Sequence, residues 1–543
     1  MNPGCKLTRV VLSFLVAVAI PVAAAAGTSN GCARFPVGST ISEPENLFSQ
    51  NGVLRVNLTY QTSLDTNGNV LYCFVNEDAA ESPTLHVKPG DTLILTVTNR
   101  LPPPSSTSME MAMPRGSEIC GAPSMNSSSV NVHYHGTNSS PKCGADEVIR
   151  TVINPGQSFT YKIVFPQDEP PGLYWYHPHI HGLSEAAVQG GASGAIVVDG
   201  IESIQPAVAG LPQRILLVRD NPLPGSSDSV AHELQAPEWD ISLSYIPVPF
   251  PSYTPAVISI RPGAREFWRL GNLAADTILD VQLQYDGQPQ ILQLVGIDGV
   301  PVGSQDGTRR GHTTAVKHLL IPPAGRAEFI ITGPPSTAKN ATLLTRAVDT
   351  GTDGDSDPTR PIAALQVNSD ASQSLVRIPA KVGAPWAQRF EGLSEAHPTA
   401  HRQLYFSEDN PDSQFFITVE GQQPVLFDPN NPPAIVTRQG SVEDWTIQNR
   451  TLENHEFHIH QIHFLLLDRN GRPVPQAQRQ FLDTIDVPHW TGSGPYPSVT
   501  IRMDFRGPDV GDFVYHCHIL EHEDKGMMAI IRVVGSSPDA AQP

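Results

Sequence analysis

The C-terminal part of the chain contains the stretch YHCHILEHEDKGM at residues 515–527, preceded by GDFV at residues 511–514. This segment reads as a β-strand, in which successive side chains point to opposite faces. The alternation predicts that His516 and His518 face one side of the strand and that Cys517 faces the other. One strand is therefore expected to carry two groups of ligands, separated by a single residue.

The residues around Cys517 match the ligands of a blue-copper centre. Such a centre combines a thiolate, imidazoles and a weakly bound thioether. Cys517, His522 and Met527 supply all of these except a second histidine. His516 and His518 are left for a different metal on the opposite face, and Cys517 then gives a short covalent path between the two sites.

Histidine pairs of the form His-X-His occur at several places in the chain. One such pair on a strand is most simply explained as two polar residues on one face. Several pairs at matched places in a repeated fold instead indicate a cluster of three copper ions, because imidazole is a good copper ligand and each ion needs several nitrogens. The pairs are His133-Tyr134-His135, His177-Pro178-His179, His458-Ile459-His460 and His516-Cys517-His518.

An internal repeat divides the chain into three parts. Each copy has a turn glycine, then an apolar strand, and ends in an asparagine nine positions after the glycine. The three glycines are Gly90, Gly263 and Gly440. A second repeat aligns residues 172–179 with residues 511–518 without gaps, and proline takes the place of cysteine between the two histidines.

The repeats, together with short strands punctuated by glycine and proline, predict an all-β fold of three Greek-key β-sandwich domains. We expect the first domain at residues 27–202, the second at 203–375 and the third at 376–543. No His-X-His pair falls in the second domain, which predicts a metal-free spacer. Helix is expected only in short connections such as residues 183–188.

Composition and charge indicate an exported protein. The chain has a net charge of -19, only 16% charged residues and 51 prolines, which is typical of an acidic, loop-rich secreted β protein and argues against nucleic-acid binding. Residues 1–26 read as a signal peptide, with Lys6 and Arg9 before an apolar run at residues 10–22. No other apolar run is long enough for a membrane span. We therefore expect a secreted or periplasmic protein.

The cysteines outside the signal peptide form an even set with one left over. Cys32, Cys73, Cys120 and Cys143 are expected to form disulfides in an oxidising compartment, and Cys517 remains for the copper. Three pairings of the four are possible. We favour Cys32 with Cys73 and Cys120 with Cys143.

These motifs resemble the four copper-binding signatures of the multicopper oxidases, the family of laccases, ascorbate oxidases, bilirubin oxidases and bacterial cuprous oxidases. Residues 455–460, HEFHIH, supply the third signature and, in His455, the missing second histidine of the blue site. The resemblance covers essentially the whole mature chain. It implies three cupredoxin-like domains and copper as the cofactor, with one type 1, one type 2 and two type 3 ions.

Carried over residue by residue, the family pattern implies a role for each ligand. His455, Cys517 and His522 bind the type 1 copper, with Met527 as the long axial ligand and Met528 as the alternative to it. Electrons enter there and pass through Cys517 to the cluster that reduces dioxygen. The cluster ligands are His133 and His458 for type 2, His135, His177 and His518 for one type 3 ion, and His179, His460 and His516 for the other.

Reduction of dioxygen to water also consumes protons, so the cluster needs carboxylates within reach. By resemblance, Glu523, directly after the type 1 histidine, and Asp146, downstream of His135, occupy the positions of the family's proton-delivery acids. The simpler interpretations are a solvated charge for Glu523 and a turn residue for Asp146. Two histidines beside the signatures, His181 and His463, lie off the family pattern and are interpreted as structural.

The resemblance implies laccase-type oxidation of phenolic or similar small donors, with dioxygen as the acceptor. The axial methionine and the sequence around Cys517 are most similar to the branch of spore-coat laccases, bilirubin oxidases and cuprous oxidases. One alternative is oxidation of cuprous or ferrous ions, for which the triplet Met109, Met111 and Met113 is the only support; a loop packed by methionines is the simpler interpretation. A non-catalytic copper carrier needs no cluster linked to a blue site, and the complete set of histidines argues against it.

Overall fold

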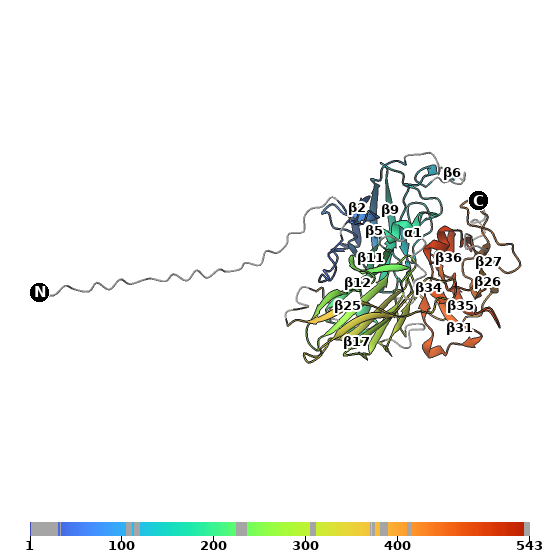
Figure 1. Ribbon diagram of the computed structural model, residues 1–543. Helices are drawn as coiled ribbons and strands as arrows, with labels where there is room; N and C mark the ends of the chain where they lie inside the picture. The colour runs from blue at the N-terminus through green and yellow to red at the C-terminus, as the bar shows by residue number, and fades with distance from the viewer. Residues whose placement is uncertain are drawn as a thin grey trace.

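β-strands make up almost all of the regular structure in this computed structural model of the chain (Figure 1). The strands fall into three groups in chain order, coloured blue to cyan, green to yellow and orange to red in Figure 1. The predicted signal peptide and the side chains of Met109, Met111 and Met113 lie outside the described residues. The structure describes residues 1, 31–32, 34–104, 111–112, 120–223, 236–303, 311–369, 371, 375–380, 389–409 and 414–536.

The first group of strands forms two facing sheets. Its strands are β1 (Asn46–Phe48), β2 (Val53–Leu64), β3 (Val70–Val75), β4 (Thr84–Val87), β5 (Thr92–Asn99), β8 (His133–His135), β9 (Ser158–Val164), β10 (Gly172–His177) and β11 (Gly194–Val198). The sheets run β3-β2-β5-β9 and β1-β4-β11-β10-β8, and β6 (Met111–Ala112) pairs with β7 (Ser124–Met125) apart from them. Buried side chains of both sheets, among them Leu93, Tyr134 and Tyr174, share one core.

The second group forms a larger sandwich of the same kind. Its strands are β12 (Gln213–Pro222), β13 (Trp239–Leu243), β14 (Ile246–Val248), β15 (Ala256–Ile260), β16 (Arg265–Asn272), β17 (Leu279–Tyr285), β18 (Gln288–Pro289), β19 (Leu292–Ile297), β20 (Val300–Pro301), β21 (Thr314–Val316), β22 (Leu319–Ile321), β23 (Arg326–Thr332), β24 (Ala341–Arg346) and β25 (Arg360–Val367). One sheet runs β14-β13-β12-β16-β23-β19-β20 and the other β15-β25-β24-β17-β18. Trp268, Leu283 and Ile362 lie in the core between them.

The third group carries the C-terminal histidine motifs. Its strands are β26 (Ala400–Glu408), β27 (Phe415–Val419), β28 (Ile435–Arg438), β29 (Val442–Asn449), β30 (His455–Ile459), β31 (Phe464–Arg469), β32 (Arg472–Pro473), β33 (Phe481–Leu482), β34 (Thr484–Val487), β35 (Ser498–Asp504), β36 (Gly511–Cys517) and β37 (Met528–Val534). The sheets run β27-β26-β29-β35-β31-β32 and β28-β37-β36-β30-β34. Their shared core contains Trp445, Phe457 and Tyr515.

All three sandwiches share one pattern of strand pairing. The parallel neighbours β2 and β5, β12 and β16, and β26 and β29 correspond to one another, and β9, β23 and β35 then pair antiparallel with the second member of each. Parallel neighbours require a connection that crosses over before it returns to the sheet. The predicted all-β class of Greek-key sandwiches is confirmed. The limits 27–202, 203–375 and 376–543 remain our proposal for the domain boundaries.

The repeated asparagine has the same structural role in each sandwich. Asn99, Asn272 and Asn449 are fully buried at the ends of β5, β16 and β29. Each side-chain amide donates to two backbone carbonyls at 2.7–3.0 Å, and each side-chain oxygen accepts from the backbone N–H two residues later. The asparagine thus satisfies the backbone where the chain leaves the strand, which a buried turn requires.

Within the described residues, helix is confined to short connections, as predicted. The helices are α1 (Ser184–Gln189) and α2 (Leu520–Asp524), with short 3-10 turns at Ile201–Ser203, Pro206–Val208 and Gln476–Gln478. None of the helices in the described ranges is both long and apolar enough to cross a bilayer. The disulfides Cys32–Cys73 and Cys120–Cys143 confirm the favoured pairing, and Cys517 is a free, buried thiol.

Candidate metal centres

A cysteine and two histidines meet at the end of β36. The Cys517 Sγ atom lies 3.7 Å from Nδ1 of both His455 and His522, and the two Nδ1 atoms are 3.0 Å apart. His455 begins β30, which pairs with β36, and His522 lies in the single helical turn of α2 that follows. All three residues are buried. The predicted type 1 ligands are therefore brought together.

The surroundings of Cys517 suit a thiolate and distinguish the two methionines. The backbone N–H of Glu456 donates to the sulfur at 3.3 Å. Met527 is fully buried in the same core as Cys517, and its carbonyl accepts from the Cys517 N–H. Met528 packs in a different cluster with Val514. This arrangement favours Met527 over Met528 as the axial residue.

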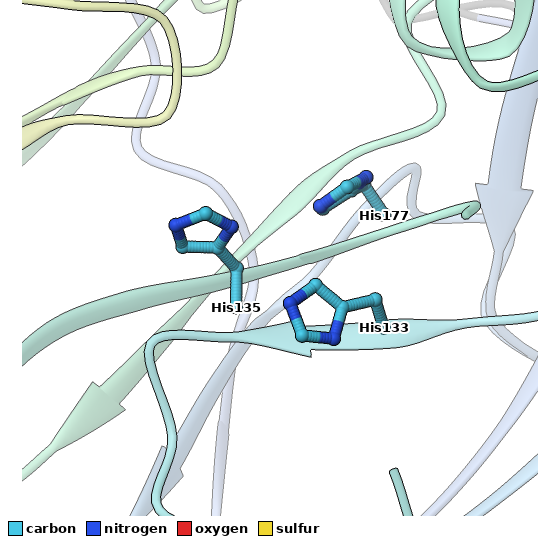
Figure 2. A group of neighbouring side chains, drawn as sticks. All are labelled: His133, His135 and His177. Atoms are coloured by element: carbon cyan, nitrogen blue, oxygen red, sulfur yellow. The ribbon is translucent and has the colours of Figure 1, made fainter. Parts of the chain in front are cut away.

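The histidine pairs converge on the opposite face of β36. β8 lies beside β10, where His133 is opposite His177, and β30 lies beside β36, where His458 is opposite His516. Figure 2 shows the rings of His133, His135 and His177 close to one another. Nε2 of His516 lies 3.3 Å from Nε2 of His179, which joins the third sandwich to the first, and 3.2 Å from Nε2 of His460 within the third sandwich.

Groups of histidines in the cluster could each hold a metal ion. One group, His179 with His460 and His516, coincides with a predicted type 3 set. For the other predicted set, the ring centroids of His135, His177 and His518 lie 5.0–5.9 Å apart. The groups whose ligand atoms lie within 4.8 Å of one another include His133, His135 and His177; His133, His458 and His460; and His179, His460 and His516.

Hydrogen bonds fix which nitrogen of several rings faces the cluster. Nδ1 lies 2.8 Å from the Pro178 carbonyl in His177 and 2.7 Å from the Cys517 carbonyl in His516. A carbonyl only accepts, so each Nδ1 carries the proton and Nε2 is free to bind a metal. Among the described residues, Nε2 of His133, His177 and His458 has no hydrogen-bond partner although it is buried.

Electrostatics also favour metal-binding imidazoles. Burial, and in most cases neighbouring imidazoles, lower the pKa of every ring in the cluster; the pKa of His516 falls to about 3. Neutral imidazole is the form that binds metals. Burial opposes protonation of His522, yet attraction by Glu453 and Cys517 outweighs it and raises the pKa of His522. The thiolate site thus attracts positive charge, and the donors of both centres fit copper.

Both predicted acids lie against cluster histidines. Asp146 Oδ1 lies 3.0 Å from Nδ1 of His133, while Glu523 is 3.8 Å from Nδ1 of His179 and 3.7 Å from Nδ1 of His516. Both carboxyls are buried, and burial raises the pKa of each well above its usual value. The interpretation of Glu523 as a solvated charge is therefore wrong, whereas Asp146 lies in a bend of the chain, as the simpler interpretation had it, but is buried there.

Sequence reasoning missed an acidic cavity beside the thiolate site. Glu453 Oε1 lies 3.3 Å from Nε2 of His522, on the side of the ring away from Cys517. A small cavity, partly open to solvent, lies there between the second and third sandwiches. Its lining residues are Asp276, Ile278, Thr350, Gly354, Asp355, Asp357, Glu453, Asn454, Ile519 and His522. Glu453, two positions before His455, was the one indication of this cavity in the sequence. The aspartates belong to the second sandwich.

Sequence reasoning also missed Asp483, which contacts His135 and His458 and is held by Arg326 of the second sandwich. The second domain was expected to be a metal-free spacer, and that expectation did not include a contact between Arg326 and the wall of the cluster. His463 donates through Nε2 to the Asp298 carbonyl at 2.8 Å, a contact that fits its structural interpretation. His181 packs edge-on against Phe427.

Comparison with known proteins identifies the family. Two family models described as multicopper oxidase match residues 124–203 and 396–536, and between them they contain every candidate ligand. The chain belongs to the multicopper oxidase family. Membership implies copper as the cofactor, and the buried histidine and cysteine groups described above fit it.

Similar multicopper oxidases cover most of the chain at low identity. The multicopper oxidase mco of Staphylococcus haemolyticus is 22% identical over 482 residues, covering 87% of this chain and 84% of the relative. The laccase of Bacillus subtilis is 23% identical over 407 residues, with coverages of 67% and 71%. A solved multicopper oxidase from Campylobacter jejuni, described as a metallo-oxidase, has a TM-score of 0.66 at 22% identity, covering 92% of this chain and 96% of its own. The structural match confirms the cupredoxin-like fold.

Proposed function

We propose that this protein is a laccase-type oxidase that removes single electrons from phenolic or similar small donors and reduces dioxygen to water. The observation that carries the proposal is the position of His522. Its Nδ1 faces Cys517, and its Nε2 faces Glu453 and the cavity. One ring thereby joins a place where a donor can dock to the thiolate site, which adjoins the histidine cluster.

We propose the ligand sets that the family pattern implies, with Met527 as the axial ligand. The contacts among His455, Cys517 and His522 support the type 1 set, and the free Nε2 atoms support the cluster. Bound copper supplies one-electron acceptance at the first site and dioxygen reduction at the second. The sets are His455, Cys517, His522 and Met527 for type 1; His133 and His458 for type 2; and His135, His177, His518, His179, His460 and His516 for type 3.

The chain's own acids would manage the protons of the reaction. Asp146 can hold a proton at Oδ1 or Oδ2 beside His133, and Glu523 can hold one at either oxygen beside His179 and His516. Glu453 can accept the hydroxyl proton of a phenol docked against His522, because its carboxylate already reaches the ring. We propose these three residues as the proton-handling groups.

A second candidate function is oxidation of cuprous or ferrous ions. The cavity beside His522 contains the carboxyl groups of Asp276, Asp355, Asp357 and Glu453. Burial opposes ionisation of Glu453, but attraction by His522 outweighs it and lowers the pKa of Glu453 to about 2, so Glu453 is anionic and attracts cationic donors. The similar Campylobacter jejuni enzyme is described as a metallo-oxidase. A copper carrier has less support, because it needs neither the acids nor a donor cavity.

Oxygen uptake by copper-loaded protein separates these functions. A methoxyphenol and cuprous or ferrous ions serve as alternative donors for the wild type, Glu453→Gln and Asp355→Asn. For a laccase, the phenol supports turnover, Glu453→Gln lowers its kcat/KM about 100-fold through loss of the base, and Asp355→Asn has little effect. For a metallo-oxidase, the ions are preferred and Asp355→Asn raises their KM.

The matched control is Glu420→Gln, which alters a surface carboxylate paired with Arg450 and should change nothing. Absence of oxygen uptake with every donor would contradict both functions.

We also propose export to the periplasm or the extracellular space. The N-terminal segment 1–26 supports this location, and so do the two disulfides, since disulfides persist in oxidising compartments.

A further inference from the structure

A buried arginine of the second sandwich reaches the wall of the histidine cluster. Arg326, the first residue of β23, forks onto Asp483 of the third sandwich, with Nη1 to Oδ1 at 2.8 Å and Nη2 to Oδ2 at 2.5 Å. Its Nε donates to the Leu173 carbonyl of the first sandwich at 3.1 Å. Both charged side chains are fully buried. One guanidinium thus connects all three sandwiches at a single point.

Asp483 in turn contacts two histidines of the cluster through different atoms. Its carboxylate Oδ1 lies 3.3 Å from Nε2 of His135, and its backbone carbonyl lies 2.8 Å from Nδ1 of His458. Both oxygens can only accept, so these nitrogens carry the protons. The opposite nitrogens, Nδ1 of His135 and Nε2 of His458, are buried and have no hydrogen-bond partner within the described chain.

We infer that Asp483, held in place by Arg326, is the positioning residue that orients His135 and His458 for copper. This rests on the proposed ligand sets. Carboxylates that accept from metal-binding imidazoles fix the ring orientation and the tautomer. Here Asp483 orients the ring of His135 from the first sandwich and the ring of His458 from the third. The guanidinium of Arg326 holds Asp483 through two hydrogen bonds.

The backbone next to His135 is fitted to this pair. Gly136 has φ +81°, and a Cβ atom built there would lie 2.4 Å from Asp483 Oδ2 and 2.5 Å from Arg326 Nη2. The turn that follows the ligand therefore packs directly on the ion pair. Asp298 supports the arrangement from the second sandwich, because its carboxylate accepts from the backbone N–H of both Arg326 and Asp483.

A second buried ion pair in the same sheet provides a matched control. Arg269 of β16 pairs with Glu328 of β23, and both side chains are fully buried. The Arg269 guanidinium contacts Gln213, Glu328 and the Phe267 ring, none of which is a proposed ligand. Loss of Arg269 removes its buried ion pair with Glu328, and loss of Arg326 removes buried ion pairs with Asp483 and Asp298. Only the loss of Arg326 alters the support of the cluster.

The test compares Arg326→Met, Arg326→Lys, Asp483→Asn and Arg269→Met after copper loading. Copper retention is measured against a graded chelator, and the type 2 signal is followed by electron paramagnetic resonance. We expect Arg326→Met to retain cluster copper about 10- to 100-fold less tightly and to change the type 2 spectrum, with the blue absorption of the Cys517 site unchanged. Arg326→Lys should rescue retention in part, and Arg269→Met should match the wild type.

Equal chelator curves and unchanged type 2 spectra in Arg326→Met and Arg269→Met overturn the inference. If Arg326→Met does not fold, Asp483→Asn carries the test, because asparagine keeps the shape and the backbone carbonyl but loses the charge; wild-type retention and spectrum in this variant overturn it as well. Failure of the proposed function looks different, because the wild type itself then binds no copper at the cluster.

Discussion

The second and third sandwiches are built on one pattern and both have an apolar interior, but they differ on the outer face of one sheet. Both end a central strand in a buried asparagine, Asn272 or Asn449, and both continue into a strand of the opposite sheet. In both sandwiches this strand contributes apolar side chains to the core, Val281 and Leu283 in the second and Phe457 and Ile459 in the third. Only in the third does the other face of the strand carry a histidine of the cluster, His458.

The difference shows that the scaffold does not depend on the metal site. Apolar residues such as Val281 and Leu283 are fully buried in the second core. The third core is equally apolar, but nitrogens of the cluster on the outer face of its sheet, such as Nε2 of His458, are buried without a hydrogen-bond partner in the described chain, and such a buried polar group costs about 1–3 kcal/mol. We expect bound copper to offset this cost, because metal binding to a folded site stabilises the fold.

The largest effect is expected where the third sandwich differs most from the second. Cys517→Ser should abolish the blue absorption and reduce donor oxidation to background, since the hydroxyl does not replace the thiolate as a copper ligand. Absorption spectra and oxygen uptake of copper-loaded protein measure both. Met528→Leu is the control, because Met528 packs away from Cys517. A Cys517→Ser protein that keeps either property contradicts the assignment.

A cavity-forming substitution in the core of the second sandwich should lower stability and leave the copper spectra unchanged. Leu283→Ala removes a fully buried side chain, and we expect it to lower the free energy of unfolding by about 2–5 kcal/mol. The copper spectra of the folded protein should be those of the wild type. Denaturant titration and absorption measure the two quantities. A change in the spectra without loss of stability would show that the two interiors are coupled.

The shared asparagines permit a closer comparison. Asn272→Ala and Asn449→Ala each leave two buried carbonyls without their donor, which should cost about 1–3 kcal/mol for each carbonyl left unpaired. Only Asn449→Ala should also alter the blue band, since Asn449 holds the turn before His455. Equal spectra for the two variants would contradict this expectation and show that the turn at Asn449 does not influence the copper site at Cys517.

The smallest effect concerns the pH dependence of the copper-free protein. The pKa of His516 is about 3 when folded against its usual 6.5, so the unfolded state binds one more proton between these values. Stability is therefore lost as the pH falls below 6.5. For His516→Asn, the slope of unfolding free energy against pH should be smaller by about 1.4 kcal/mol per pH unit. Urea unfolding at several pH values measures it. An unchanged slope in His516→Asn contradicts the buried neutral imidazole.

Local patterns in the sequence predicted much of the fold and the ligands. The asparagine repeat predicted three sandwiches, and strand alternation predicted opposite faces for Cys517 and His516, because both patterns act within one strand. The partnership of Arg326 with Asp483 spans 157 positions. It depends on how the sandwiches dock, and neither residue has a metal-ligand spacing. The acidic cavity escaped prediction for the same reason, since Glu453 and Asp355 meet only across an interface.

The most direct test of the account is the copper content of the loaded wild type, measured together with its absorption and paramagnetic resonance spectra. The account predicts four copper ions per chain, an intense blue thiolate-to-copper band and a separate type 2 signal. Protein that binds copper without a blue band, or that shows the band with no copper at the histidine cluster, would contradict it.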